Sequence, residues 1–178
     1  MTNDRNSLLE ALLAMVQQNG GKIDSRIRLQ KIGYLMGRLG IPGIRRASYE
    51  YHYYGPYSRE VSDSIRVAVS TGLLEEDFEE LSSEIRRYSY RLTETGSAAV
   101  SEGELDAQWT EVLEKLIVLT KGQSVKTLEL AATGLYLMDG EGLEAEIALG
   151  KAIELKPGCR EVRDQAKQVM IDVQRLNC

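Results

Sequence analysis

The chain has 178 residues and a formal net charge of −5, with 43% hydrophobic and 28% charged residues. This balance is typical of a folded globular protein rather than a disordered one, and the length allows one domain or two small lobes. There is no apolar run near the ~20 residues that a transmembrane helix needs and no signal-peptide pattern, so we expect a cytoplasmic protein that makes no membrane contact.

Basic residues are concentrated near the N-terminus. Residues 1–50 contain eight Lys or Arg and four Asp or Glu, whereas residues 51–178 contain 14 and 23. A polyanionic partner would therefore prefer the first third of the chain. The two cysteines, Cys159 and Cys178, have no metal-ligand spacing, so we expect reduced thiols and no disulfide scaffold.

An amphipathic helix opens the chain. Leucines spaced three and four residues apart predict a helix over residues 7–18, and Ser7 with Glu10 has the pattern of a capping box. The following Gly20 and Gly21 supply its end, because glycine accepts the left-handed backbone found at helix termini.

A second helix is expected over residues 25–39, with Asp24 as its N-cap. Gly33 and Gly37 lie four residues apart on it, so a neighbouring backbone could approach closely there. Its apolar positions predict a buried face made of Leu29, Ile32, Leu35, Met36 and Leu39.

Tyrosines form the most informative cluster of the sequence, with five of the nine tyrosines within nine positions. The alternation of Tyr49, Tyr51 and Tyr53 predicts a strand, and we expect its rings to pack against the core. Tyr54 and Tyr57 flank the turn and are the better candidates for contact with a partner.

Proline favours the first helical position, so a third helix is expected over residues 56–71. Two strands, residues 73–80 and 85–93, follow it. The first strand is acidic, which favours cross-strand ion pairs with Arg86, Arg87 and Arg91 of the second. Thr93 then caps a short helix that runs to about Val100.

Three helices, two strands and a helix are the element order of a winged-helix module with an extra strand before its third helix. In this interpretation residues 56–71 are the recognition helix and residues 73–93 are the wing. The remaining sequence is helical, with a loop expected over residues 139–142. We therefore predict a mainly α (α+β) protein, with a winged-helix-like lobe and small β-hairpin wing over 1–101 and a C-terminal helical bundle over 102–178 packed on it.

The sequence offers little for catalysis. His52 is the single histidine, no cysteine has a partner at ligand spacing, and neither a nucleophile elbow nor a phosphate-binding glycine loop is present. We expect no metal, no cofactor and no enzymatic activity, although a carboxylate pair among the 27 acids stays an open alternative.

Two stretches resemble the YwgA-like group of bacterial and archaeal proteins. They are residues 28–35 (Arg-Leu-Gln-Lys-Ile-Gly-Tyr-Leu) and 53–61 (Tyr-Tyr-Gly-Pro-Tyr-Ser-Arg-Glu-Val). Residues 128–133 and 155–157 extend this resemblance over most of the chain. Over about residues 5–100 the sequence is also similar to the Panacea, or SocA-like antitoxin, domain, although Gly33 stands where a larger apolar residue is expected.

The resemblance implies a regulatory or antitoxin-like binding role and transfers no catalytic residue. Our leading hypothesis is a non-enzymatic, winged-helix-type module that binds a protein partner and forms a homodimer. Its expected surface combines the turn before the third helix with the exposed polar side of the second helix. The candidate partner-binding residues are Arg28, Lys31, Arg38, Tyr54, Tyr57, Ser58 and Arg59.

The alternative hypothesis is a sequence-specific DNA-binding transcriptional regulator that acts as a dimer through its C-terminal helices. The candidate nucleic-acid-binding residues are Arg45, Arg46, Arg59, Arg66 and Arg87. Against this alternative, the third helix carries Glu60 and Asp63 beside Arg59 and Arg66, which leaves no net attraction for phosphate.

Overall fold

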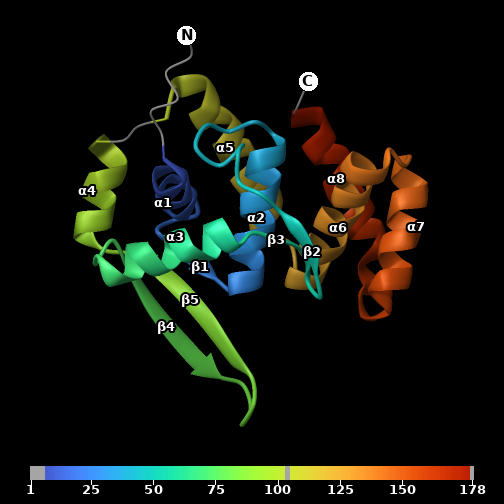
Figure 1. Ribbon diagram of the computed structural model, residues 1–178, viewed down its shortest axis with the longest axis horizontal. Helices are drawn as coiled ribbons and strands as arrows, with labels where there is room; N and C mark the ends of the chain where they lie inside the picture. Colours follow the sequence, from blue (N-terminus) through green and yellow to red (C-terminus); the bar gives the residue numbers. More distant parts are fainter. Residues whose placement is uncertain (1–6, 103–104, 177–178) are drawn as a thin grey trace.

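The computed structural model describes residues 7–102 and 105–176, and it is a mainly helical α+β protein (Figure 1). Its α-helices are α1 (Leu8–Gln18), α2 (Arg26–Arg38), α3 (Arg59–Ser70), α4 (Glu94–Glu102), α5 (Ala107–Lys121), α6 (Val125–Glu141), α7 (Ala145–Leu155) and α8 (Arg163–Leu176), with a 3₁₀ helix, η1, over Pro157–Val162. Its strands are β1 (Lys22–Asp24), β2 (Glu50–His52), β3 (Gly55–Tyr57), β4 (Leu74–Glu80) and β5 (Arg86–Leu92).

The larger sheet is antiparallel, with strand order β1-β5-β4. The two strands expected around residues 73–93 are confirmed, and so are their cross-strand ion pairs, which join Glu75, Glu79 and Glu80 to Arg91, Arg87 and Arg86. Figure 1 shows this β4–β5 ribbon extending away from the helices. Strand β1 was not predicted, because three residues are too short for a recognisable alternation.

The N-cap of α1 is the expected residue, whereas that of α2 is not. The capping box of Ser7 and Glu10 at α1 is confirmed. The N-cap expected at Asp24 is wrong, because Asp24 pairs with Ser89 in the sheet. The side chain of Ser25 caps α2 instead and accepts hydrogen bonds from the N–H groups of Ile27 and Arg28.

The third helix begins later than the sequence suggested. Pro56 was expected to start it, but Pro56 lies in β3, opposite Tyr51 of β2, and α3 begins only after its N-cap Ser58. The residues before this helix are therefore held extended in a second, two-stranded sheet.

The loop expected over residues 139–142 is also wrong. Helix α6 runs through Asp139 to Glu141, and Gly142 ends it in the left-handed conformation. The extra turn places Asp139 where its carboxylate accepts from Arg38, at 2.8 and 3.0 Å.

One hydrophobic core runs through both parts of the chain and includes Leu12 of α1, Leu35 of α2 and Leu130 of α6. The close approach expected at the glycines of α2 is confirmed, since a Cβ on Gly37 would lie 3.2 Å from the carbonyl oxygen of Ile44. The ring of Trp109 on α5 packs near Gly40, just past the end of α2.

Helix α6 lies centrally and packs against α2, β3, α7 and α8 (Figure 1). Among the described residues, no helix combines the length and apolar character needed to cross a bilayer.

Candidate binding cleft

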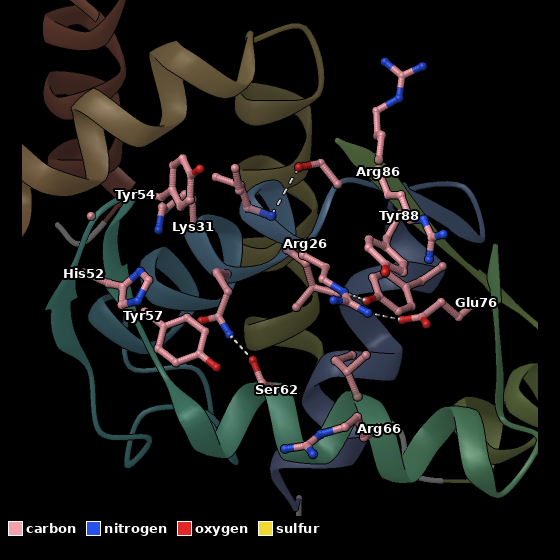
Figure 2. Close-up of a pocket in the computed structure, with 18 of the residues that line it drawn as sticks. Arg26, Lys31, His52, Tyr54, Tyr57, Ser62, Arg66, Glu76, Arg86 and Tyr88 are labelled. Carbon is pink, nitrogen blue, oxygen red and sulfur yellow. Dashed lines mark hydrogen bonds and ion pairs between the residues drawn. The ribbon is translucent and has the colours of Figure 1, made fainter. Parts of the chain in front are cut away.

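A cleft of about 670 Å³ lies between α2, α3, the β2–β3 hairpin and the β4–β5 ribbon (Figure 2). Figure 2 shows three walls: His52, Tyr54 and Tyr57 on the hairpin side, Ser62 and Arg66 on α3, and Arg26, Glu76 and Tyr88 where α2 meets the ribbon. A volume of this size is within the range of ordinary ligand sites.

The back of the cleft is held together by two neighbouring side chains of α2. The amide of Gln30 accepts from the N–H of Ser58 and donates to its carbonyl oxygen, both at 2.9 Å, and also donates to Ser62 Oγ. The Nζ of Lys31 donates to the carbonyl oxygen of Pro56 at 2.8 Å. The two stretches that carry the resemblance are thus fastened to one another.

Lys31 is fully buried, with 1% of its surface exposed. Burial lowers the pKa of its ammonium to about 7, opposed by the charge of Glu129 and assisted by that of Lys156. The neutral amine retains N–H donors for Pro56, so the bond to the hairpin does not require the charged form.

A buried ion pair supports the hairpin from the side of α6. The Nζ of Lys156 lies 2.8 Å from Glu129 Oε1, and it also donates to the carbonyl oxygen of Tyr53. Gly55 fits against the same helix without a side chain, since a Cβ there would lie 2.5 Å from Thr133 Oγ1. The hairpin is therefore a firmly seated element.

The aromatic side of the cleft is largely exposed. Tyr54 is 53% exposed, and the ring of His52 lies 5.3 Å from that of Tyr57 and 5.5 Å from that of Tyr53. The expected core packing is wrong for Tyr51 and Tyr53, which are 42% and 87% exposed. These two rings lie on a hairpin that forms a sheet of only two strands, with no third strand among the described residues.

Tyr49 does pack inward as expected. Its ring lies edge-on to Tyr34 at 5.3 Å, and its hydroxyl is buried beside Gly33. This contact explains why Gly33 is small at a position where a larger residue was anticipated.

The ribbon side of the cleft is built around Arg26. Its guanidinium carbon lies 3.5 Å from the centre of the Tyr88 ring, its Nε donates to the hydroxyl of Tyr90 at 2.8 Å, and Nη2 reaches Glu76 at 3.1 Å. Burial raises the pKa of Tyr90, so this hydroxyl stays neutral. The stacking and the two bonds fix the orientation of Arg26.

The cleft is basic although the protein is acidic. Five basic side chains and one acidic side chain, Glu76, line it, whereas the chain as a whole carries −5. Three of the arginines are paired with solvated carboxylates just outside the lining, Asp63, Glu79 and Glu80. The basic residues are Arg26, Lys31, Arg66, Arg86 and Arg87.

Several candidate partner-binding residues have internal roles instead. The exposure expected for Lys31 is wrong, and Ser58 is buried as the N-cap of α3. Arg28 donates to the carbonyl oxygens of Thr120 and Gln123, and Arg38 is bound to Asp139. The polar side of α2 faces α3, α5 and α6, and so it is not the open surface that we expected.

Other candidate residues divide between the cleft and the outer surface. Tyr54, Tyr57, Arg66 and Arg87 line the cleft. Arg59 is exposed outside it, 3.8 Å from Asp63. Arg45 and Arg46 lie in the segment after α2 and do not belong to the lining.

Sequence reasoning missed the central residues of the site, Arg26, Gln30, Glu76 and Tyr88. The Leu-Gln-Lys element could be identified in the sequence. Nothing in its pattern indicates that Gln30 hydrogen-bonds the backbone of Ser58, 28 positions away. Arg26 and Tyr88 meet only because β1 pairs with β5, a strand pairing that the sequence does not signal.

Within residues 7–102 and 105–176, no group of three or more His, Cys, Asp or Glu side chains is arranged to hold a metal ion. Cys159 is a buried free thiol, and Cys178 lies outside the described residues.

No protein-family model matches the chain. It is 30% identical over 166 residues to a Bacillus subtilis (strain 168) protein named "Uncharacterized protein YwgA". The match covers 93% of this chain and 95% of that protein.

Proposed function

The chain belongs to the YwgA family, and we propose that it is a non-enzymatic regulatory protein that binds a partner protein in the cleft. The observation that carries the proposal is the exposed aromatic hairpin edge, where Tyr54 stands beside a basic cleft. Exposed aromatic and arginine side chains around a hollow are the residues that most often anchor a protein interface.

We also propose a winged-helix relationship for residues 8–92. In its support, α1, β1, α2 and α3 precede the β4–β5 ribbon, and β1 joins that ribbon in the order β1-β5-β4. The antitoxin-like role implied by the sequence resemblance fits a protein whose function is to bind another protein.

Affinity capture tests the proposal. The full-length protein is immobilised as wild type, as Tyr54→Ala and as Tyr53→Ala, and proteins retained from the native cell lysate are identified by mass spectrometry. Tyr53 is the matched control, because it is a neighbouring exposed tyrosine that does not line the cleft. We expect a specific partner that Tyr54→Ala loses and Tyr53→Ala keeps. Equal retention by all three proteins would contradict the proposal.

DNA binding is the second candidate, favoured by the exposed arginines Arg59 and Arg66 on α3. Both lie against Asp63, so a DNA-binding α3 should gain affinity in Asp63→Asn and lose it in Arg66→Gln. A gel shift with the upstream region of its own gene at low salt tests this candidate, and absence of any shift removes it. A homodimer formed through the C-terminal helices belongs to the same proposal, and sedimentation equilibrium tests it.

A further inference from the structure

We propose that the cleft recognises an acidic, extended segment of the partner protein. The inference rests on the proposed function and adds the chemistry of recognition. The cleft has basic side chains on separate walls, a short unpaired strand edge along one side and the exposed Tyr54 at one end.

The charged groups come from separate walls of the cleft. Arg26 projects from the start of α2 and Arg66 from α3 (Figure 2). Each is held by one carboxylate of the same chain, Glu76 for Arg26 at 3.1 Å and Asp63 for Arg66. The side chains of Arg26 and Arg66 are 54% and 74% exposed. Solvated pairs of this kind are weak, so carboxylates of a partner can take the place of these internal acids.

The edge of β5 that faces β1 borders the cleft near Tyr88 and Arg86. The N–H of Ser25 donates to the carbonyl oxygen of Tyr88 at 2.7 Å, so the backbone of Tyr88 faces β1. Alternation along an antiparallel strand gives Arg86 the same backbone direction. Strand β1 ends at Asp24, opposite Ser89, and no other described strand pairs with this edge of β5. An extended peptide can therefore continue the line of β1 beside Arg86.

The distribution of acids favours a short peptide over a nucleic acid. The outer part of β4 is acidic, and α3 carries Glu60 and Asp63 beside its arginines. A polynucleotide has a phosphate at every step and would run past these acids as it left the cleft. A peptide can confine its carboxylates to the few positions that face Arg26, Arg66 and Arg86.

The test uses the full-length protein and three fluorescein-labelled probes. One is an octapeptide of alternating glutamate and tyrosine, the second has glutamine in place of glutamate, and the third is an eight-nucleotide thymidine oligomer. Binding is measured by fluorescence anisotropy. We expect the glutamate peptide to bind about tenfold more tightly than the glutamine peptide, because charge complementarity is its distinguishing feature. Its affinity should fall as salt is added.

Variants of the Arg26–Glu76 pair distinguish recognition of an acidic peptide from a purely structural role of these residues. Glu76→Gln removes the carboxylate that competes for Arg26, which stays stacked on Tyr88 and bonded to Tyr90. It should strengthen binding of the glutamate peptide several-fold, whereas Arg26→Gln and Arg66→Gln should weaken it. Arg175→Gln is the matched control, since Arg175 is an exposed, ion-paired arginine on α8. Circular dichroism melting verifies that each variant is folded.

Equal binding of the two peptides, tighter binding of the thymidine oligomer, or no gain in Glu76→Gln would overturn the inference. These failures are distinct from failure of the proposed function. A captured partner that depends on Tyr54 but is unaffected by Arg26→Gln, Arg66→Gln and salt leaves the proposed function intact and rejects acidic recognition. If Tyr54→Ala also retains every captured protein, both the proposed function and the recognition of an acidic segment are rejected.

Discussion

At the residue scale, the structure explains what the Leu-Gln-Lys element does. Gln30 and Lys31 line the back of the cleft but are buried there, rather than forming the exposed surface that we expected. They hydrogen-bond the backbone of the segment that precedes α3. The motif could be found in the sequence, but its structural role could not, because a side-chain hydrogen bond to a distant backbone leaves no periodic pattern in the sequence. Lys31 is the clearest case, since a lysine is expected at the surface unless a partner compensates its burial.

Lys31 predicts a pH-dependent stability. Its pKa is about 7 in the folded protein, against 10.5 ordinarily, so above pH 7 the unfolded chain binds the additional proton. The free energy of unfolding should therefore rise with pH through this window, with a slope approaching about 1.4 kcal/mol per pH unit from this group alone. Below about pH 7 both states carry the proton and the slope from this residue vanishes.

Urea unfolding of the wild type and Lys31→Met at several pH values measures the effect. The methionine variant lacks the titrating group, so the difference between the two proteins should become more favourable to the wild type as the pH rises from about 7 to about 9. A difference that is independent of pH would mean that Lys31 titrates at its ordinary pKa.

The buried pair of Glu129 and Lys156 predicts a large loss of stability on substitution. Their side chains are 12% and 3% exposed, so Glu129→Gln leaves a buried ammonium without its counter-charge. We expect the free energy of unfolding to fall by about 3–5 kcal/mol. Glu161→Gln removes the exposed pair with Lys126 and should change stability little. Urea unfolding measures both, and similar losses in the two variants would contradict this account.

At the scale of elements, the strongly patterned pieces were predictable. The capping box fixed the start of α1, and the acidic and basic strands identified the β4–β5 ribbon because opposite charges face each other across it. The β2–β3 hairpin was misread as a strand leading into a helix. Pro56 is compatible with either structure, and only the contacts of the hairpin with α6 decide between them.

Those contacts predict a steric effect at Gly55. Gly55 and Gly72 both have a positive φ, +85° and +73°, but only Gly55 would place a Cβ against another group, Thr133. Gly72→Ala should cost about 1–2 kcal/mol for the backbone alone. Gly55→Ala should cost a further 1–3 kcal/mol, about the penalty of overpacking.

The double variant Gly55→Ala/Thr133→Ala identifies the cause. It should recover part of the stability that Gly55→Ala loses, because it removes the atom that the new methyl group meets. Thermal unfolding measures the stability of the wild type, Gly55→Ala, Gly72→Ala and the double variant. Equal losses in Gly55→Ala and Gly72→Ala would show that the hairpin can shift away from α6 without strain.

At the scale of the whole molecule, the chain was expected to form two lobes, residues 1–101 and 102–178, with the second packed on the first. The core is continuous across both parts, because α6 packs on α2 and β3 as well as on α7 and α8. Sequence periodicity identifies the buried face of each helix, but it carries no information about which faces meet. The cleft could not be predicted for the same reason, since its walls come from four separate segments.

The continuous core predicts cooperative unfolding. In native-state hydrogen exchange, the slowest amides of α2 and of α6 should open with the same free energy, because neither helix keeps its core contacts without the other. Amides in the outer half of the β4–β5 ribbon should exchange much faster, since its residues are exposed. Separate opening free energies for α2 and α6 would indicate two independent units.

The packing of Trp109 near Gly40 has a practical consequence. The protein has one indole, and it lies where α5 meets the end of α2, the helix that also supplies Arg26 to the cleft. An intrinsic fluorophore therefore sits at the joint between the two halves of the chain. Any occupant of the cleft that tilts α2 would alter the emission of this ring, which makes the unlabelled protein its own optical reporter.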